Sequence, residues 1–365
     1  MTQLSTALDA PRRFSPPLGS GQAVQLLTPA GRLVADDPFV WDGSLDDARA
    51  HLRALVLVRR LDHEGMMLQR QGKLSLWGEL KGQEAVQVGI AAALSPDDYV
   101  FPSYREHGLA MLMGLPTSEL LSTWASTEFC NWKAEPDRFH AYQFVIGAQT
   151  LQAVGYAMGM ALDDEPGATI VFHGDGAISQ GDVNEAYAFA ASYQAPVVFV
   201  CTNNQWAISE PVALQSRVPL YQRAWGFGIP SVQVDGNDVL AMREVAAWAL
   251  EHARSGKGPV MIEAFTFRMG GHTTADDPTR YRSRDEVEAW AKRDPILRLQ
   301  TWLEAQGAWS DADAARLEAE ADALGERVRA EVAALQPVTL PEMFDHLFAD
   351  KTDELAAQQA EAADA

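Results

Sequence analysis

The sequence predicts an α/β fold: a mostly parallel sheet flanked by helices on both faces, with helical extensions at the N- and C-terminal ends. The first observation is the order of residues 169–201, where two apolar runs, TIVF and VVFVC, enclose a segment whose apolar residues recur with helical spacing. A crossover of this length makes the two strands parallel and their connection right-handed. The second observation is that strand and helix patterns alternate again between residues 231 and 267.

The N-terminal part of the chain is expected to be an arm followed by a long helix. Residues 1–43 are rich in Pro and Gly, which favours an extended arm over the surface or over a partner. Ser44 can cap a helix that runs to about Arg70, because Asp46 and Asp47 then lie in its first turn. Two further helices are expected, over 83–94 and from Pro116 onwards.

The central and C-terminal segments complete the expected domain. Residues 150–162 are apolar, with Gly155 and Gly159 four positions apart, and are expected to form a core helix that packs closely. The remaining elements expected are strands over 231–234 and 259–267 and helices over 182–194, 239–254 and 311–335. We therefore expect an α/β domain over 44–335 and an acidic tail over 336–365, formed as a frayed helix or left disordered.

The composition limits the classes of function. The chain has 365 residues, with 29 basic against 50 acidic residues and a formal net charge of −21. Nucleic acids and anionic membranes both attract basic surfaces, so neither is expected as a partner. Two cysteines exclude a disulfide framework, and no run reaches the roughly 18 apolar residues that span a bilayer. The first residues lack the apolar core of a secretory signal, and the early Asp9 and few arginines disfavour a transit peptide, so we expect a cytoplasmic protein of bacterial type rather than one of the mitochondrial matrix.

Two polar pairs follow the two central strands and could share one cation. Gly174-Asp175-Gly176 comes after the first strand, and Asn203-Asn204 comes after the second. The carboxyl ends of parallel strands meet at one edge of the sheet, where open α/β sheets bind ligands. Asp175 offers a carboxylate and Asn204 an amide oxygen, which are ligands that magnesium prefers, often together with phosphate oxygens. Each pair alone is more typical of a turn or a cap, but together they predict a magnesium site for a phosphorylated cofactor.

The longer string around these pairs resembles a known cofactor motif. GDGAISQGDVNEAYAFAASYQAPVVFVCTNNQWAIS is similar to the thiamine diphosphate and magnesium motif of the 2-oxo acid dehydrogenase family. The similarity is to the alpha subunit of the decarboxylating, first component of these complexes, over about residues 69–303. It implies a thiamine diphosphate-binding fold, with magnesium held by Asp175, Asn204 and the main-chain carbonyl of Trp206. The cofactor contacts that it implies here come from Gly174, Asp175, Gly176, Ala177 and Asn204.

A second cluster, FPSYREH, contains a candidate phosphate clamp. Arg105 can grip phosphate through two donors and Tyr104 adds a hydroxyl, although from the residues alone an arginine–glutamate surface pair is an equal alternative. The resemblance places this Tyr-Arg pair on the cofactor diphosphate. Thr202 stands where some relatives have a basic residue, so Arg105 would carry more of the diphosphate charge.

A third stretch, VIGAQ, resembles the segment that bends the cofactor. Ile146 is the candidate for the bulky aliphatic side chain that lies between the thiazolium and aminopyrimidine rings, although from the residues alone it would be assigned to the core. Backbone groups of this stretch would bind the pyrimidine. Phe144, two positions earlier, departs from the small or polar residue of the family, which affects the contacts with diphosphate or substrate.

Residues 268–282 (RMGGHTTADDPTRYR) form a polar, glycine-containing loop after the last expected strand. Taken alone, His272 is more typical of a solvated loop histidine. The resemblance makes it the catalytic histidine, which contacts the cofactor and assists acyl transfer. Thr273 matches a serine that is phosphorylated in the mitochondrial relatives, but that regulation needs a dedicated kinase and is not inferred for this chain.

One residue that thiamine diphosphate chemistry needs is absent from the matching motifs. The cofactor is activated by a Glu that protonates its aminopyrimidine ring, and in this family that Glu comes from the beta subunit. The resemblance therefore implies an alpha2-beta2 heterotetramer in which this chain alone is inactive. The expected partners are the beta subunit, the lipoyl acyltransferase core and a small-molecule 2-oxo acid.

The expected reaction is the oxidative decarboxylation of a 2-oxo acid, with transfer of the acyl group to a lipoyl group. The strings NNQWAIS and GHTTADDPTRYR favour a branched-chain substrate, while a pyruvate or an acetoin-type dehydrogenase alpha subunit stays open. A non-catalytic scaffold subunit is the alternative from another class, and intact Asp175, Asn204, Arg105 and His272 disfavour it. A nicotinamide-binding oxidoreductase is disfavoured because no GxGxxG opens a helix after a strand.

Overall fold

The central sheet has five parallel strands in the computed structural model, which describes residues 23–363 except 36, 129, 131 and 346. The strand order is β1-β2-β3-β7-β6, so β3 lies at the centre. The strands are β1 (Tyr99–Phe101), β2 (Thr169–Gly174), β3 (Val197–Asn203), β6 (Ser231–Asp235) and β7 (Val260–Phe265). A separate antiparallel pair joins β4 (Trp206–Ala207) to β5 (Glu210–Pro211). The predicted mostly parallel sheet is confirmed.

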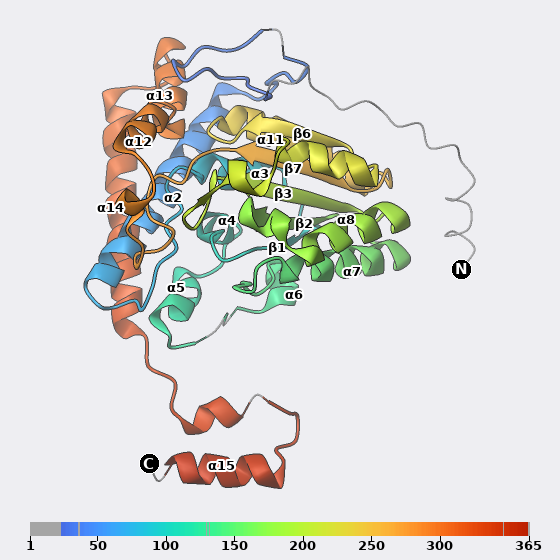
Figure 1. The fold of residues 1–365 in the computed structure, drawn as a ribbon. Helices are drawn as coiled ribbons and strands as arrows, with labels where there is room; N and C mark the ends of the chain where they lie inside the picture. Colours follow the sequence, from blue (N-terminus) through green and yellow to red (C-terminus); the bar gives the residue numbers. More distant parts are fainter. Residues whose placement is uncertain (1–22, 36, 129, 131, 346, 364–365) are drawn as a thin grey trace.

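Helices cover both faces of this sheet (Figure 1). On one face, α11 (Val239–Arg254) packs on β3, β6 and β7, and α3 (Glu84–Ala93) packs on α11. On the other face lie α7 (Ala148–Leu162) and α8 (Gly181–Tyr193). Because side chains alternate along a strand, Ile170 and Phe172 of β2 join the core under α11, whereas Val171 joins the core under α7 and α8. The predicted helical layers are therefore confirmed.

Two C-terminal helices, α13 and α14, pack on the long N-terminal helix α2 beside the sheet (Figure 1). Ser44 caps α2 as predicted: its hydroxyl accepts from the N–H of Asp47 at 3.1 Å, and the Asp47 carboxylate accepts from the N–H of Ser44 at 2.8 Å. The bounds are α2 (Leu45–Arg70), α13 (Pro295–Ala305) and α14 (Asp311–Ala334). The other helices are α4 (His107–Leu112), α5 (Thr117–Ala125), α6 (Ala134–Asp137), α9 (Val212–Gln215), α10 (Leu220–Arg223), α12 (Arg284–Ala291) and α15 (Asp353–Ala363).

Helix α7 packs differently from the prediction. Ala153, Val154 and Ala157 lie in the core beneath it. Gly155 is exposed, and no atom lies within 4 Å of the place that a Cβ of Gly155 or Gly159 would take. The expectation that these glycines allow close packing is wrong within this chain, because both face away from the residues that the helix buries.

The two ends of the described chain differ in how they meet the domain. Val24 forms a parallel bridge with Val234 of β6, and Leu26 and Leu27 are buried. In contrast, α15 is largely exposed and lies apart from the domain in Figure 1. The predicted boundaries at residues 43 and 335 stay predictions, and residues 1–22 of the predicted arm lie outside the described residues. Among the described helices, none combines the length and apolarity needed to cross a membrane.

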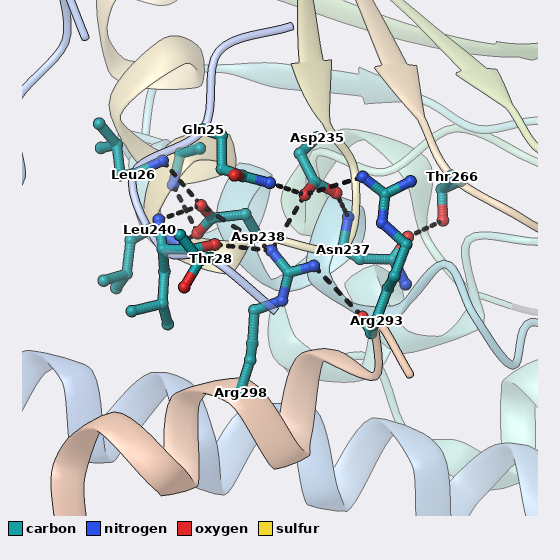
Figure 2. Close-up of polar contacts among 12 residues, drawn as sticks. Gln25, Leu26, Thr28, Asp235, Asn237, Asp238, Leu240, Thr266, Arg293 and Arg298 are labelled. Carbon is teal, nitrogen blue, oxygen red and sulfur yellow. Dashed lines mark hydrogen bonds and ion pairs between the residues drawn. The ribbon is translucent and has the colours of Figure 1, made fainter. Parts of the chain in front are cut away.

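A buried polar cluster joins the N-terminal segment to the sheet and to α13 (Figure 2). Arg298 of α13 is 1% exposed and donates to the carboxylate of Asp235 at 3.0 Å and to the carbonyl of Leu27 at 2.9 Å. Asp238 accepts from four main-chain N–H groups, two at the start of α11 and two in the N-terminal segment. We refer to Asp235, Asp238 and Arg298 as the Arg298 cluster. It fixes the N-terminal segment at the carboxyl end of β6.

Candidate active site

A cavity of about 220 Å³ lies at the carboxyl edge of the sheet. The loops that follow β1, β2, β3 and β7 provide much of its lining, as expected for an open α/β sheet. All ten residues predicted for the site line this cavity. The described residues that line it are Gln83, Ser103, Tyr104, Arg105, Glu106, Gln143, Ile146, Gly147, Gln149, Gly174, Asp175, Gly176, Ala177, Thr202, Asn204, Trp206, Ala207, Ile208, Arg268 and His272.

Asp175 directly follows β2 and is 2% exposed. Its Oδ2 atom is buried without a hydrogen-bond partner. Burial raises the pKa of this carboxyl to about 6, because removal from water disfavours the charged form. A carboxylate oxygen in this state fits a cation, which would stabilise the charged form. A Cβ on Gly176 would lie 2.7 Å from the Cβ of Ala207, so glycine allows the β4–β5 hairpin to approach this turn.

Asn204 lies one residue beyond the end of β3 and is buried. Its Nδ2 donates to Oε1 of Gln83 at 3.3 Å, and its Oδ1 accepts from the main-chain N–H of Trp206 at 3.3 Å. Among the described residues, no group of three or more His, Cys, Asp or Glu side chains could hold a metal ion. The predicted cation site instead combines the carboxylate of Asp175 with amide and main-chain oxygens, which is a donor set that suits magnesium.

The carbonyl oxygen of Trp206 already has a protein partner. Arg268 donates to it through Nη1 at 2.7 Å, and through Nη2 to the carbonyl of Ile208 at 2.7 Å and to the hydroxyl of Tyr281 at 3.0 Å. Arg268 is 1% exposed, and burial lowers its pKa. A carbonyl has two lone pairs, so Trp206 keeps one for a metal. Arg268 nevertheless places a fixed positive charge next to the predicted cation site.

Arg105 and Tyr104 lie together on the loop after β1. Arg105 is 5% exposed and donates to the carbonyl of Glu79 and, at 2.9 Å, to the carbonyl of His272. The carboxylate of Glu106 instead accepts from the main chain and hydroxyl of Ser103 at 2.7 and 2.8 Å. Arg105 therefore does not form the arginine–glutamate surface pair that was the alternative from the residues alone. The guanidinium carbon lies 5.4 Å from the centre of the Tyr104 ring, within the range of a cation–π contact.

Residues 144–146 are three exposed apolar residues beside the cavity, here called the apolar rim, and Ile146 is the one that lines it. Ile146 is 43% exposed and lines the cavity, so it is not the core residue that the residues alone suggested. Phe144 is 44% exposed and stacks on Tyr104, with ring centres 5.7 Å apart and planes 9° apart. Gln149, at the start of α7, donates to the carbonyl of Phe172 at 2.7 Å, while its buried Oε1 has no partner. Phe144, which replaces the small or polar residue of the family, therefore packs its ring against Tyr104 of the candidate phosphate clamp.

His272 lies in the polar loop after β7 and is partly buried. Burial, with smaller contributions from Arg105 and Arg268, lowers its pKa to about 4. Its main-chain N–H donates to Asp276 at 2.6 Å, and Asp276 also accepts from the hydroxyl of Tyr281. The imidazole is therefore neutral at pH 7, in a loop ordered by these contacts, and it is not the solvated histidine that the residues alone favour.

Among the described residues that line the cavity, Glu106 is the one glutamate. It is 4% exposed, and burial raises its pKa. Its carboxylate holds the turn at Ser103 and accepts weakly from the N–H of Arg105 at 3.4 Å. A carboxylate engaged in this way maintains the loop and is poorly placed to act on a bound cofactor.

Sequence reasoning missed two buried residues of the cavity, Arg268 and Gln83. Arg268 was the first residue of the predicted loop, and a lone arginine directly after a buried strand was the available signal. Gln83 offered no signal, because it is a polar residue at the start of a predicted helix, some 120 positions before Asn204. Only the packing of α3 on α2, α4 and α11 brings Gln83 to the site.

Comparison with known proteins gives a consistent assignment over most of the chain. The family model of the dehydrogenase E1 component matches residues 52–336. The chain is 43% identical over 343 residues to the 3-methyl-2-oxobutanoate dehydrogenase subunit alpha of Mycobacterium tuberculosis (strain ATCC 25618 / H37Rv), covering 93% of this chain and 92% of that protein. It is 39% identical over 312 residues to the pyruvate dehydrogenase E1 component subunit alpha of Acholeplasma laidlawii, covering 85% and 90%. The subunit of the same name from Bacillus cereus is 39% identical over 291 residues, covering 79% and 78%.

Proposed function

Since the chain belongs to the family of the dehydrogenase E1 component, we propose that it is the alpha subunit of a 2-oxo acid dehydrogenase that acts with a beta subunit. The observation that carries this proposal is the meeting of all ten predicted positions in one cavity at the carboxyl edge of the sheet. A scaffold subunit that kept only the fold would have no need of these residues. The family depends on thiamine diphosphate, which is the cofactor proposed for this cavity, with magnesium.

The polar groups of the cavity fit this cofactor. Asp175 offers a buried oxygen without a partner, and Asn204 and the Trp206 carbonyl add neutral oxygens for magnesium. Arg105 and Tyr104 would bind the diphosphate, and Arg105 would exchange carbonyl partners for phosphate oxygens. When bound, thiamine diphosphate supplies the carbon nucleophile and the electron sink for decarboxylation.

The other residues of the chain would orient the reactants and hold a proton at a defined atom. Ile146 would support the bent conformation of the cofactor from the rim of the cavity. His272 is uncharged at neutral pH, because burial lowers its pKa to about 4. Its Nδ1 faces Nη2 of Arg105 at 3.5 Å, which is a donor, so Nδ1 is the acceptor and the proton lies on Nε2. Nε2–H is then the group that would donate a hydrogen bond to the reacting groups during acyl transfer to the lipoyl group, because the neutral ring is too weak an acid to give up its proton.

The cavity has the character of half a site. Its volume of about 220 Å³ lies below the roughly 300–1,000 Å³ of typical ligand pockets. Its single glutamate holds a turn. Both features support a beta subunit that completes the site and supplies the activating Glu, in the alpha2-beta2 assembly expected from the resemblance. The lipoyl acyltransferase core would be the second protein partner, and the cytoplasm the expected location.

For the substrate we propose a branched-chain 2-oxo acid, with pyruvate as the alternative. The relative at 43% identity is named for 3-methyl-2-oxobutanoate, whereas the two relatives at 39% are named for pyruvate. The apolar rim over residues 144–146 favours a substrate with an apolar side chain. An acetoin-type substrate is the remaining alternative.

The test is co-expression of this chain with its beta subunit, followed by titration with thiamine diphosphate in the presence and absence of magnesium. We expect binding that depends on magnesium, and decarboxylation of 3-methyl-2-oxobutanoate that is faster than that of pyruvate at equal concentration. Binding that is indifferent to magnesium would contradict the cofactor site. Faster turnover of pyruvate would contradict only the substrate.

A further inference from the structure

Gln83 and Asn204 form a contact between two carboxamides at the wall of the cavity. Gln83 is 2% exposed and Asn204 is 7% exposed. Gln83 presents its oxygen to Nδ2 of Asn204, while the main-chain N–H of Trp206 donates to Oδ1 of Asn204 at the other end of the same amide. The two ends of an asparagine side chain are nearly equal in shape but opposite in hydrogen bonding. An acceptor at one end and a donor at the other therefore decide which end is oxygen and which is nitrogen.

The position of Gln83 is set by the residue before it. Gly82 has a φ of +99°, and a Cβ there would lie 2.1 Å from the carbonyl oxygen of Phe267. The carbonyl of Gly82 accepts from the hydroxyl of Thr266 at 2.5 Å and from Nδ2 of Asn237 at 3.4 Å. The turn is thus pressed against the strand end that leads into the candidate active-site loop, and only glycine fits there.

Asn237 is in turn fixed by the Arg298 cluster (Figure 2). Its N–H donates to Oδ1 of Asp235 at 3.0 Å, and its Oδ1 accepts from the hydroxyl of Thr266 at 2.8 Å. Figure 2 shows this continuous path from Arg298 through Asp235 and Asn237 to Thr266. The buried ion pair therefore supports, through Gly82, the backbone from which Gln83 reaches Asn204.

The two ends of Gln83 are used unequally. Its oxygen is committed to Asn204, whereas its buried Nε2 atom has no partner. A glutamine kept only to stabilise the fold would be expected to satisfy both ends, because an unmade buried hydrogen bond costs about 1–3 kcal/mol. The contact with Asn204 is thus the polar interaction by which the side chain of Gln83 acts on the site.

We infer that Gln83 is a positioning residue, which holds the carboxamide of Asn204 with its oxygen toward the cation site. The inference rests on the proposed function, because it assigns Gln83 to the magnesium ligand Asn204. Residues that orient a metal ligand from behind typically change metal affinity by about 10- to 100-fold when replaced. Gln83 would act on magnesium binding, and on thiamine diphosphate only through magnesium.

The test uses the complex of this chain with its beta subunit and compares Gln83→Leu with Gln83→Glu. Leucine keeps the size but cannot accept a hydrogen bond, whereas glutamate keeps an acceptor oxygen toward Asn204. Magnesium is titrated calorimetrically at saturating thiamine diphosphate, and the unfolding midpoint is measured without either ligand. We expect Gln83→Leu to raise the magnesium Kd by at least about tenfold, and Gln83→Glu to bind magnesium at least as tightly as the wild type.

A matched control and the opposing results separate this inference from the proposed function. Gln300→Leu makes the same change on α13, away from the cavity, and should leave the magnesium Kd unchanged. An unaltered Kd in Gln83→Leu, with normal binding by the wild type, overturns the inference and leaves the proposed function intact. A tenfold loss in Gln83→Glu overturns it as well, even where Gln83→Leu does not fold. A wild-type complex without magnesium-dependent cofactor binding would overturn both.

Discussion

Two buried polar groups of residues lie at the carboxyl edge of the same sheet, and they differ in how well their atoms are satisfied. In the Arg298 cluster, both carboxylates accept several hydrogen bonds, and Nε of Arg298 is the one side-chain atom left without a partner. Of the residues that line the cavity, five leave a buried polar atom unpaired: Gln83, Gln149, Asp175, Trp206 and Arg268.

This difference separates a group that stabilises the fold from a group that is arranged to bind. A buried ion pair whose atoms are nearly all hydrogen-bonded favours one arrangement of the chain. Removal of one partner leaves a buried charge without compensation, which destabilises the folded state. Unsatisfied atoms lower stability until a ligand meets them. A substitution in the Arg298 cluster should therefore lower stability, whereas one in the cavity should weaken binding and can raise stability.

The largest effect on stability is expected for Arg298→Met. The substitution leaves Asp238 buried without a cation and Asp235 with only Arg293, 3.8 Å away, so the free energy of unfolding should fall by about 3–5 kcal/mol. Urea unfolding measures this change. Arg316→Met, on the exposed side of α14, is the matched control and should change stability by less than about 0.5 kcal/mol. A loss below about 1 kcal/mol in Arg298→Met would remove the Arg298 cluster from its structural role.

The opposite behaviour is expected for Asp175→Asn. Magnesium-dependent binding of thiamine diphosphate should be lost, because the one carboxylate of the predicted cation site is gone. Without ligands the variant should be more stable at pH 8, by up to about 3 kcal/mol, since burial raises the folded-state pKa of Asp175 to about 6 from an ordinary 3.8.

The sign of this effect gives a pH test. An acid with a raised pKa in the folded state costs stability above that pKa, and the cost vanishes below the ordinary value, where both states are protonated. The gain of Asp175→Asn should thus be present at pH 8 and absent near pH 4. Asp182→Asn, at the exposed start of α8, is the control that should show neither effect. Retained magnesium-dependent binding in Asp175→Asn would contradict the metal site.

A smaller and more selective effect is expected for His272→Asn. Lipoyl acylation should slow by roughly 100-fold or more, as for the loss of a group that assists proton transfer, while cofactor affinity changes little. Rapid-quench measurement of acyl transfer, beside cofactor titration, separates the two. His63→Asn, on the exposed side of α2, is the control. Normal acylation in His272→Asn would end its catalytic assignment.

The pKa of His272 adds a prediction about acid stability. Burial lowers its folded-state pKa to about 4 from 6.5, so the folded protein resists protonation that the unfolded chain accepts. His272 therefore contributes a loss of stability as the pH falls from about 6.5 to 4, and His272→Asn should show less of this loss. Equal acid sensitivity in thermal unfolding curves of both proteins would contradict the neutral, buried imidazole.

The smallest effect is expected for Phe144→Ser. Removing the ring that stacks on Tyr104 makes the apolar rim less apolar, so the ratio of branched-chain to pyruvate kcat/KM should fall by roughly tenfold or less. Phe144→Leu keeps most of the apolar volume, so its ratio should lie between those of the wild type and Phe144→Ser. An unchanged ratio in both variants would exclude Phe144 from substrate selection.

The sequence was sufficient for elements whose pattern is local. The helix expected over 239–254 has the same bounds as α11, because its apolar period and flanking residues act within a few turns. The strand expected over 197–201 extends to Asn203, because pairing with Phe265 of β7 adds ladder contacts that no local pattern contains. Gly155 and Gly159 were misjudged for a similar reason: a glycine pair predicts a close approach but not which side of the helix is covered.

The candidate site was predictable as far as its residues lie in recognisable strings. Asp175 and Asn204 could be placed together because parallel strands end at one edge. The use of the Trp206 carbonyl by Arg268 and the contact of Gln83 with Asn204 could not be placed, since both depend on residues some 60 to 120 positions away. Such contacts are set by how helices and loops pack over the strand ends.

By itself, the sequence determined the parallel α/β architecture, the two strand ends that carry Asp175 and Asn204, and the family to which these strings belong. The burial, protonation and orientation of the site residues were decided by the tertiary structure alone. Burial leaves an oxygen of Asp175 unpaired and keeps His272 neutral, and distant side chains orient Asn204. The reason is physical: periodicity and turn chemistry act within a few residues, whereas desolvation and hydrogen-bond partners depend on everything that packs around a group.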